Sequence, residues 1–147
     1  MSRHLIQSVV FTVECDQVRG QGRPRFRLKG GTYKSNEDKA WEKRIRDAYS
    51  AQCPYKDMAG FADEVHISIH THRRLPSSAP ARIESEPDLH APDADNIAKS
   101  VLDALNRLAF RDDKQVTQLN VFKHDRKRIG KERMTVHVKY YAEVNER

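Results

Sequence analysis

The sequence contains no long apolar run, and no stretch of its 147 residues approaches the roughly 18 apolar residues that predict a membrane-spanning helix. Cysteine is scarce: Cys15 and Cys53 are the only two, and neither belongs to a Cys-x-x-Cys pair. This scarcity argues against a disulfide framework and favours a reduced, cytoplasmic protein. The glycine-rich signatures of nucleotide binding are missing, so no nucleotide cofactor is expected. The first residues are polar and the next apolar run is short, so no signal peptide is predicted.

Charge, by contrast, is abundant. Charged residues make up 33% of the chain, hydrophobic residues 37%, and the net charge is +6. A positive excess without a basic amphipathic helix favours nucleic acid over a membrane surface as the partner. The length predicts one domain spanning residues 1–147, large enough to bury a core.

Hydrophobic periodicity predicts an α+β fold. Strands are expected at 5–14, 63–71, 116–124 and 133–141, where β-branched residues are frequent or apolar and polar residues alternate. Two main helices are expected, one from about 35 to 52 and one from about 93 to 108. Because some predicted strands follow one another without a helix between them, we expect a mixed β-sheet with the helices on one face. The connection 73–91 is long, and such loops are often functional.

Two basic segments are candidates for contacts with DNA phosphates. The first is an arm at 19–34, which holds six basic residues, no acid, and a Gly30-Gly31 hairpin signal. The second is the turn that follows the strand at 116–124. The predicted DNA-binding residues are Arg23, Arg25, Arg27, Lys34, Lys123, Arg126, Lys127 and Arg128. The structural alternative is that both segments are simply solvated surface.

The segment 92–116 concentrates acidic residues at the ends of two predicted elements. Asp93 and Asp95 open a helix, and Asp112 and Asp113 stand where a strand should begin. Carboxylates gathered in this way suit a shared divalent cation, which hard oxygen ligands hold. The alternative is an acidic helix start with a surface ion pair between Asp95 and Lys99. A calcium loop of the EF-hand type is excluded by the residues at its ligand positions.

Chemistry assigns provisional roles within this segment. Asp93, Asp95 and Asp113 are the predicted metal ligands and catalytic carboxylates, and Lys99 is predicted to meet charge on a phosphate. Asp112 ranks lower because it would point away if Asp113 already lies in a strand. Asp103, on the same helix stripe as Asp95 and Lys99, also ranks lower. A zinc site on the predicted strand face of His66, His70 and His72 is a further alternative.

The strings PDADNIAKSVLDAL and FRDDKQV together resemble the RusA-type Holliday junction resolvases. That family shows Pro-Asp-x-Asp-Asn-hydrophobic-x-Lys, then Asp-Ala-Leu, then Asp-Asp-x-Gln-hydrophobic. The matching residues are Pro92, Asp93, Asp95, Asn96, Ile97, Lys99, Asp103, Ala104, Leu105, Asp112, Asp113, Gln115 and Val116. The segment 20–25 and Lys123 also look like family positions, whereas Arg107-Leu108-Ala109 replaces a glycine turn that many relatives have.

The resemblance implies a RusA-like fold and a homodimer that makes paired, Mg²⁺-dependent nicks across a four-way DNA junction, with Mn²⁺ as a substitute. It further implies a bacterial or phage-encoded protein associated with the nucleoid. Two alternatives stay open at this point: a catalytically silent DNA-binding protein of the same fold, and a nuclease that acts on forks, flaps or RNA.

Overall fold

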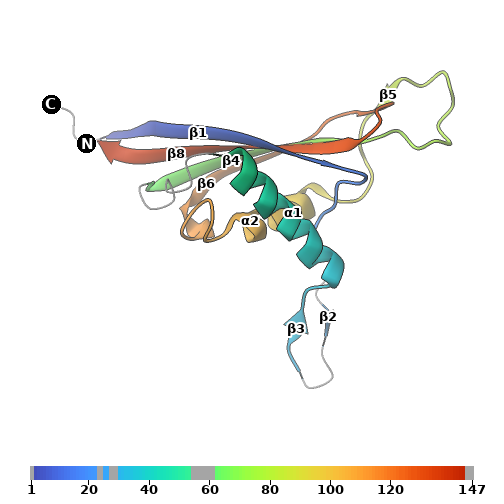
Figure 1. The fold of residues 1–147 in the computed structure, drawn as a ribbon. Coiled ribbons are helices and arrows are strands. Elements are labelled where there is room, and N and C mark those ends of the chain that lie inside the picture. Colours follow the sequence, from blue (N-terminus) through green and yellow to red (C-terminus); the bar gives the residue numbers. More distant parts are fainter. Residues whose placement is uncertain (1, 23–24, 27–29, 54–61, 145–147) are drawn as a thin grey trace.

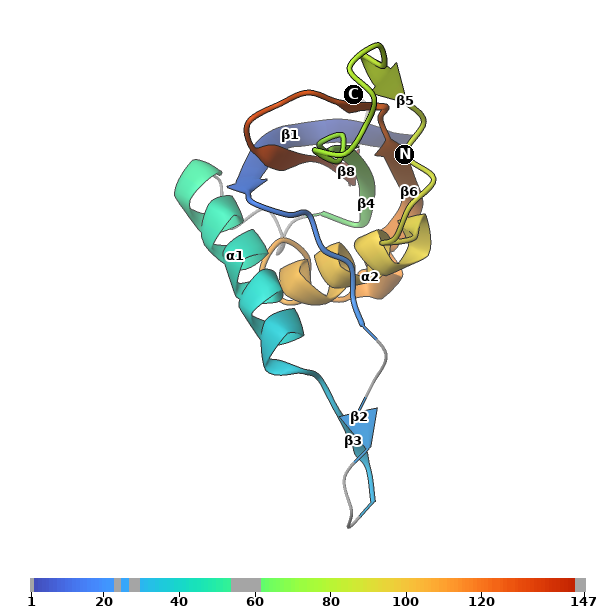
Figure 2. The same cartoon turned by 90° about the vertical axis from the view of Figure 1, so that its right-hand side faces the viewer.

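The computed structural model describes residues 2–22, 25–26, 30–53 and 62–144. Its centre is a four-stranded sheet in the order β1-β8-β4-β6. These strands are β1 (Ser2–Cys15), β4 (Glu64–His72), β6 (Val116–Lys123) and β8 (Glu132–Val144). Both helices, α1 (Asn36–Gln52) and α2 (Ala94–Leu105), lie on the same face of the sheet (Figures 1 and 2). Within the described residues, no helix is long and apolar enough to cross a membrane.

The sheet is mixed, as predicted. β8 pairs antiparallel with β1 on one side and with β4 on the other, while β4 and β6 run parallel. A parallel pair needs a long crossover connection, and here that connection contains the long loop and α2. The α+β architecture of a mixed four-stranded sheet with two main helices is therefore confirmed.

The alternating strands bury one side chain in two against the helices. In β4, Val65, Ile67 and Ile69 are fully buried, whereas His66 and Ser68 between them are only partly covered. In the core, the hydroxyl groups of Tyr49 and Tyr140 form a 3.0 Å hydrogen bond. This bond satisfies two phenol groups that burial would otherwise leave unpaired.

Local signals define where the helices begin. Ser35 caps α1, because its hydroxyl accepts a 3.1 Å hydrogen bond from the backbone N–H of Asp38. The buried face of α2 comprises Ile97, Ala98, Ser100, Val101, Ala104 and Leu105. This stripe has the helical spacing expected from the sequence, and it leaves Asp95 and Lys99 on the exposed side.

The basic arm forms a hairpin of β2 (Arg25–Phe26) and β3 (Thr32–Tyr33) that projects away from the sheet and helices (Figures 1 and 2). Gly30 and Gly31 have φ angles of 89° and 81°, in the left-handed region that glycine adopts without strain. The glycine pair therefore supports the turn that the sequence predicted.

The long loop at 73–91 is better structured than its sequence indicates. It contains β5 (Ser85–Glu86), which pairs antiparallel with β7 (Arg126–Lys127). Two turns, closed by backbone hydrogen bonds from Ala79 to Pro76 and from Ile83 to Pro80, precede β5. The loop is thus tied to the segment between β6 and β8.

Candidate active site

The first acidic pair lies at the start of α2 and is exposed. Asp93 is the N-cap residue of the helix, yet its side chain makes no capping hydrogen bond. Asp95 and Lys99 follow on the solvent side, one helical turn apart. Among the described residues, the structure records no side-chain hydrogen bond or ion pair for Asp93, Asp95 or Lys99. Two carboxylates and one ammonium group are therefore available to a ligand at this helix end.

The second acidic pair differs from its prediction. Asp113 begins a short 3-10 helix, η2 (Asp113–Gln115), and β6 begins only at Val116. Asp112 caps this helix, accepting a 2.9 Å hydrogen bond from the backbone N–H of Lys114. That bond, together with a hydrogen bond to the Asp113 side chain, lowers the pKa of Asp112. The reason for ranking Asp112 lower does not apply here, because it supposed that a strand already begins at Asp113.

The two acidic pairs lie at opposite ends of α2 within one chain. The twelve residues of α2 span about 18 Å, and the eight residues of β6 run back over about 26 Å. At the far end of β6, the Lys123 ammonium donates a 2.7 Å hydrogen bond to the carbonyl of His90, three residues before Asp93. In the described part of the chain, no three His, Cys, Asp or Glu side chains form a group that could hold a metal ion. A cation shared by Asp93, Asp95 and Asp113 stays a prediction, and a single chain does not assemble it.

Asp103 and Lys34 belong to an internal cluster instead. The Lys34 ammonium lies 2.6 Å from a Glu42 carboxylate oxygen and 3.0 Å from one of Asp103. Burial opposes the charge on Lys34, but its hydrogen bonds to Glu42 and Asp103 outweigh burial and raise its pKa. The Gln21 amide also donates to Asp103 at 3.1 Å. These contacts engage both residues in joining the base of the hairpin to α1 and α2.

A model of the family "Endodeoxyribonuclease RusA" matches residues 17–139 of this chain. This chain belongs to the RusA endodeoxyribonuclease family. The matched segment contains every predicted site residue. The chain is also 30% identical over 126 residues to the uncharacterized protein YqaN of Bacillus subtilis (strain 168), a match that covers 78% of this chain and 86% of YqaN.

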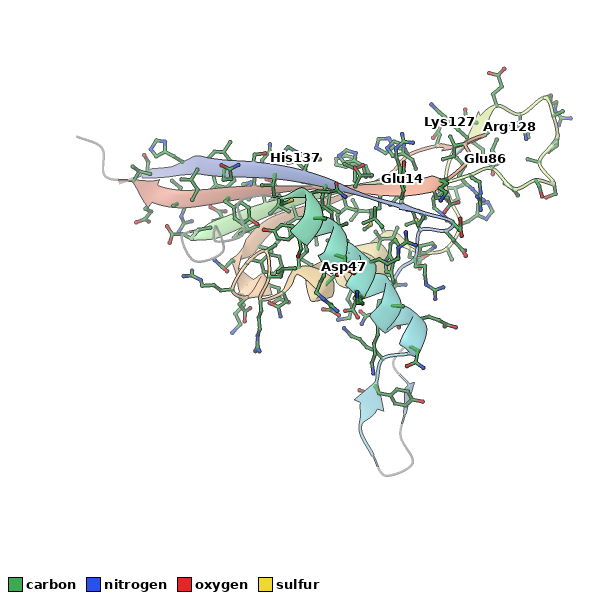
Figure 3. All side chains as sticks on the ribbon, in the orientation of Figure 1. Glu14, Asp47, Glu86, Lys127, Arg128 and His137 are labelled. Atoms are coloured by element: carbon green, nitrogen blue, oxygen red, sulfur yellow. The ribbon has the colours of Figure 1, made fainter. Side chains whose placement is uncertain are left out.

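In this RusA family member, the basic residues that follow β6 also stabilise the fold through hydrogen bonds to backbone carbonyl groups. Arg126 Nε donates to the carbonyl of Arg74 at 2.8 Å, and Arg128 donates to the carbonyls of Ala79, Pro80 and Ile83. With Lys123 bonded to His90, three of the four predicted phosphate contacts hold the long loop. Lys127 and Arg128 lie beside β5, at the loop end of the sheet (Figure 3). Their contact with DNA stays a prediction.

The arm residues are only partly described. Arg23 and Arg27 lie outside the described residues, and for Arg25 only the backbone is described, paired with Tyr33 across the hairpin. The RusA family member has a hairpin that projects from the sheet and helices, and this position suits a segment that reaches DNA. Its phosphate contacts also stay predictions.

Sequence analysis missed a buried charged network beside the acidic motif. Arg73, Asp88 and Glu132 are buried, and the Arg73 guanidinium lies 3.5 Å from Asp88 and 3.4 Å from Glu132. Arg73 directly follows the alternating strand β4, so its position in the sequence hinted at burial. Its partners are 15 and 59 residues away, and no local pattern connects them.

The histidines of β4 stack instead of standing apart in solvent. The rings of Phe122, His70, His124 and His72 form a column, with neighbouring centroids 4.7, 5.0 and 4.4 Å apart. His70 Nδ1 lies 2.8 Å from His124 Nε2, a hydrogen bond between the two rings. Burial lowers the pKa of His72 to about 4. His70 and His72 alternate with the buried residues of β4 and so lie on the face of the sheet away from the helices. His137 lies on the same face (Figure 3).

Proposed function

We propose that this protein is a Mg²⁺-dependent endonuclease that resolves Holliday junctions by paired nicks during DNA recombination and repair. The observation that carries the proposal is the exposed, unengaged set of Asp93, Asp95 and Lys99 at one helix end, in a chain of the RusA family. We place this activity on bacterial or phage DNA at the nucleoid, and we propose Mn²⁺ as a substitute for Mg²⁺.

The donor set at the start of α2 suits a hard divalent cation. Carboxylate oxygens are preferred ligands of Mg²⁺, and the Asp93 carboxylate is not used to cap its helix. Bound there, Mg²⁺ would neutralise phosphate charge and lower the pKa of a ligated water. Asp93 and Asp95 would hold the ion. The Lys99 ammonium would donate to a phosphate oxygen as negative charge develops in the transition state.

We propose that a second copy of the chain supplies Asp113. β6 is an edge strand of the sheet, and an edge strand presents unpaired backbone groups to another strand. Antiparallel pairing of two β6 strands about a two-fold axis would place the start of one strand beside the end of the other. Asp113 of each copy would then approach the Asp93–Asp95 pair of its partner, because the end of β6 lies near His90.

Such a homodimer has two equivalent sites related by a two-fold axis. The strands of a four-way junction are themselves related by near two-fold symmetry, so paired sites suit paired nicks. The basic hairpin of each copy would hold the sugar-phosphate backbone, which the carboxylates alone would repel. This role of the hairpin accounts for an acidic site on a protein whose net charge is +6.

The proposal is tested by cleavage of synthetic four-way junctions, forks, flaps and linear duplexes, each with and without Mg²⁺ or Mn²⁺. We expect two symmetric nicks in the junction, only when the metal is present. Junction binding without cleavage in either metal would identify a silent DNA-binding protein of this fold. Faster cleavage of forks or flaps than of junctions would change the proposed substrate and leave the proposed metal-dependent hydrolysis unchanged.

A further inference from the structure

The turn that carries the acidic pair is fixed to the domain by a buried arginine. Arg73 Nη1 donates a 2.7 Å hydrogen bond to the carbonyl of Ala91, two residues before Asp93. The same guanidinium lies against Asp88 and Glu132, and all three side chains are at most 6% exposed. Buried carboxylates on both sides hold the guanidinium in one position, because an arginine fork fixes direction as well as charge.

A second anchor holds the other side of the turn. The backbone N–H of Gln21 donates to the carbonyl of Asn96 at 3.0 Å. Gly20 lies so close to the turn that an added Cβ would stand 2.8 Å from Cβ of Pro92 and 3.0 Å from Cβ of Asn96. The backbone from 18 to 21 therefore packs directly against the start of α2, and glycine is required at this contact.

Both anchors meet at Glu132 on β8. One carboxylate oxygen of Glu132 accepts from the backbone N–H of Val18 at 2.9 Å and from Arg73 Nε at 3.4 Å. Its other oxygen accepts from the backbone N–H of Arg74 at 2.9 Å. One carboxylate thus sets the position of Arg73, which bonds Ala91, and of the segment that supports Pro92 and Asn96.

We infer that Arg73 and Glu132 are positioning residues that fix the direction in which Asp93 and Asp95 project toward their ligand. The inference rests on the proposed function, because it takes the acidic pair to be the metal site. The Asp93 side chain makes no capping bond, so its direction is set by the path of the chain into α2. Arg73 and Glu132 control that path, as outer-shell partners orient metal ligands in other proteins.

The test compares Arg73→Lys with Arg74→Lys, a matched control at the next position. The Arg74 guanidinium bonds the carbonyls of Gly130 and Asp16, neither of which belongs to the acidic turn. A lysine at position 73 keeps the positive charge but loses the fork that joins Glu132 and Ala91. We expect Arg73→Lys to weaken Mn²⁺ binding to the DNA-free protein by about 10-fold, measured by calorimetry, with unchanged KM for the junction.

A role confined to stability would lower the unfolding temperature of Arg73→Lys and leave its Mn²⁺ affinity unchanged. That result would overturn the inference, as would an equal loss of affinity in Arg74→Lys. Unsubstituted protein that neither binds Mn²⁺ nor cleaves DNA would instead overturn the proposed function, and the inference with it. The two failures are therefore separate.

Gly20→Ala tests the second anchor without removing a buried charge, and it decides the question if Arg73→Lys does not fold. The new methyl group must push Pro92 or Asn96 aside, so we expect Mn²⁺ affinity to fall here as well. The control is Gly130→Ala, where an added Cβ meets nothing within 4 Å. Wild-type Mn²⁺ affinity in folded Gly20→Ala would show that the position of the turn does not govern the site.

Discussion

The two acidic pairs of the motif differ in what their carboxylates do in the folded chain. Asp93 and Asp95 are exposed, and within the described residues their side chains form no hydrogen bond or ion pair. Asp112, in contrast, caps η2 and accepts a hydrogen bond from the backbone N–H of Lys114. The first pair is therefore available to a ligand, whereas the second pair partly stabilises the local structure. The difference supports the proposal that Asp93 and Asp95 bind the cation.

The largest expected effect is the loss of the first pair. Asp93→Asn and Asp95→Asn should each lower the junction cleavage rate by about 10³-fold, because each removes a charged ligand from the proposed cation. Junction binding in the absence of metal should persist or tighten, since a negative charge near phosphate is lost. Asp47→Asn, at an exposed aspartate on α1, is the control. Near-normal turnover in either variant would remove that aspartate from the site.

Mixed dimers test whether the two pairs meet across subunits. One chain carries Asp93→Asn and Asp95→Asn, and the other carries Asp113→Asn. If each site combines both chains, a mixed dimer retains one intact site, and single nicks should return when the two inactive proteins are combined. If each site lies within one chain, every site stays defective. Gel assays that resolve nicks from paired cuts would show which arrangement holds.

Lys99→Ala should reduce turnover by about 10²-fold, because a preorganised positive charge would be lost from the transition state. Lys99→Arg keeps the charge and changes its reach, so partial recovery is expected. Mn²⁺ affinity and the unfolding temperature should stay close to those of the unsubstituted protein. Full activity in Lys99→Ala would return this residue to a surface ion pair with Asp95.

Asp103 provides the contrast on the same helix. Because it bonds Lys34 and Gln21, Asp103→Asn should lower the free energy of unfolding by about 1 kcal/mol or less and leave cleavage unchanged. Denaturant unfolding and cleavage rates measured on the same samples check both parts. A large loss of cleavage with normal stability would move Asp103 into the site.

The smallest expected effect concerns the histidine column, whose residues are not part of the proposed site. Burial lowers the pKa of His72 from 6.5 to about 4, so unfolded chains bind a proton that folded chains exclude. Stability should therefore fall as the pH falls from about 6.5 to about 4. His72→Gln should reduce the proton uptake on unfolding by up to about one proton. The charged or titratable groups around His72 are Arg133, His124, His70 and Lys127.

The sequence predicted the main elements well because their signals are local. Alternating apolar residues marked β4, and the Ser35 cap and helical spacing marked α1 and α2. The 3-10 helix at Asp113–Gln115 was missed, since three residues carry no periodicity and the following strand dominated the pattern. The lower rank given to Asp112 rested on the assumption that this segment is already a strand.

The site was less predictable than the fold because its geometry depends on distant partners. The positive charge of Lys34 suggested a phosphate contact. In the structure Lys34 instead forms a hydrogen bond with Asp103, which lies 69 residues away in the sequence. Arg128 was predicted to lie on a basic turn, yet its guanidinium donates hydrogen bonds to carbonyl groups of the long loop. The charge of a residue indicates that it needs an oppositely charged or polar partner. Whether that partner is DNA or the protein itself depends on the fold.

The position of β8 in the sheet constrains when the protein becomes a nuclease during its synthesis. β8 lies between β1 and β4, and its pairing with β1 joins Ser2 to Val144, so the sheet gains its central strand last. Such long-range pairing forms slowly and late. Glu132, which supports the acidic turn, is the first residue of β8. A ribosome-bound chain that has not yet released this strand should therefore hold Asp93 and Asp95 without their support, and under the proposed function it would not yet cut DNA.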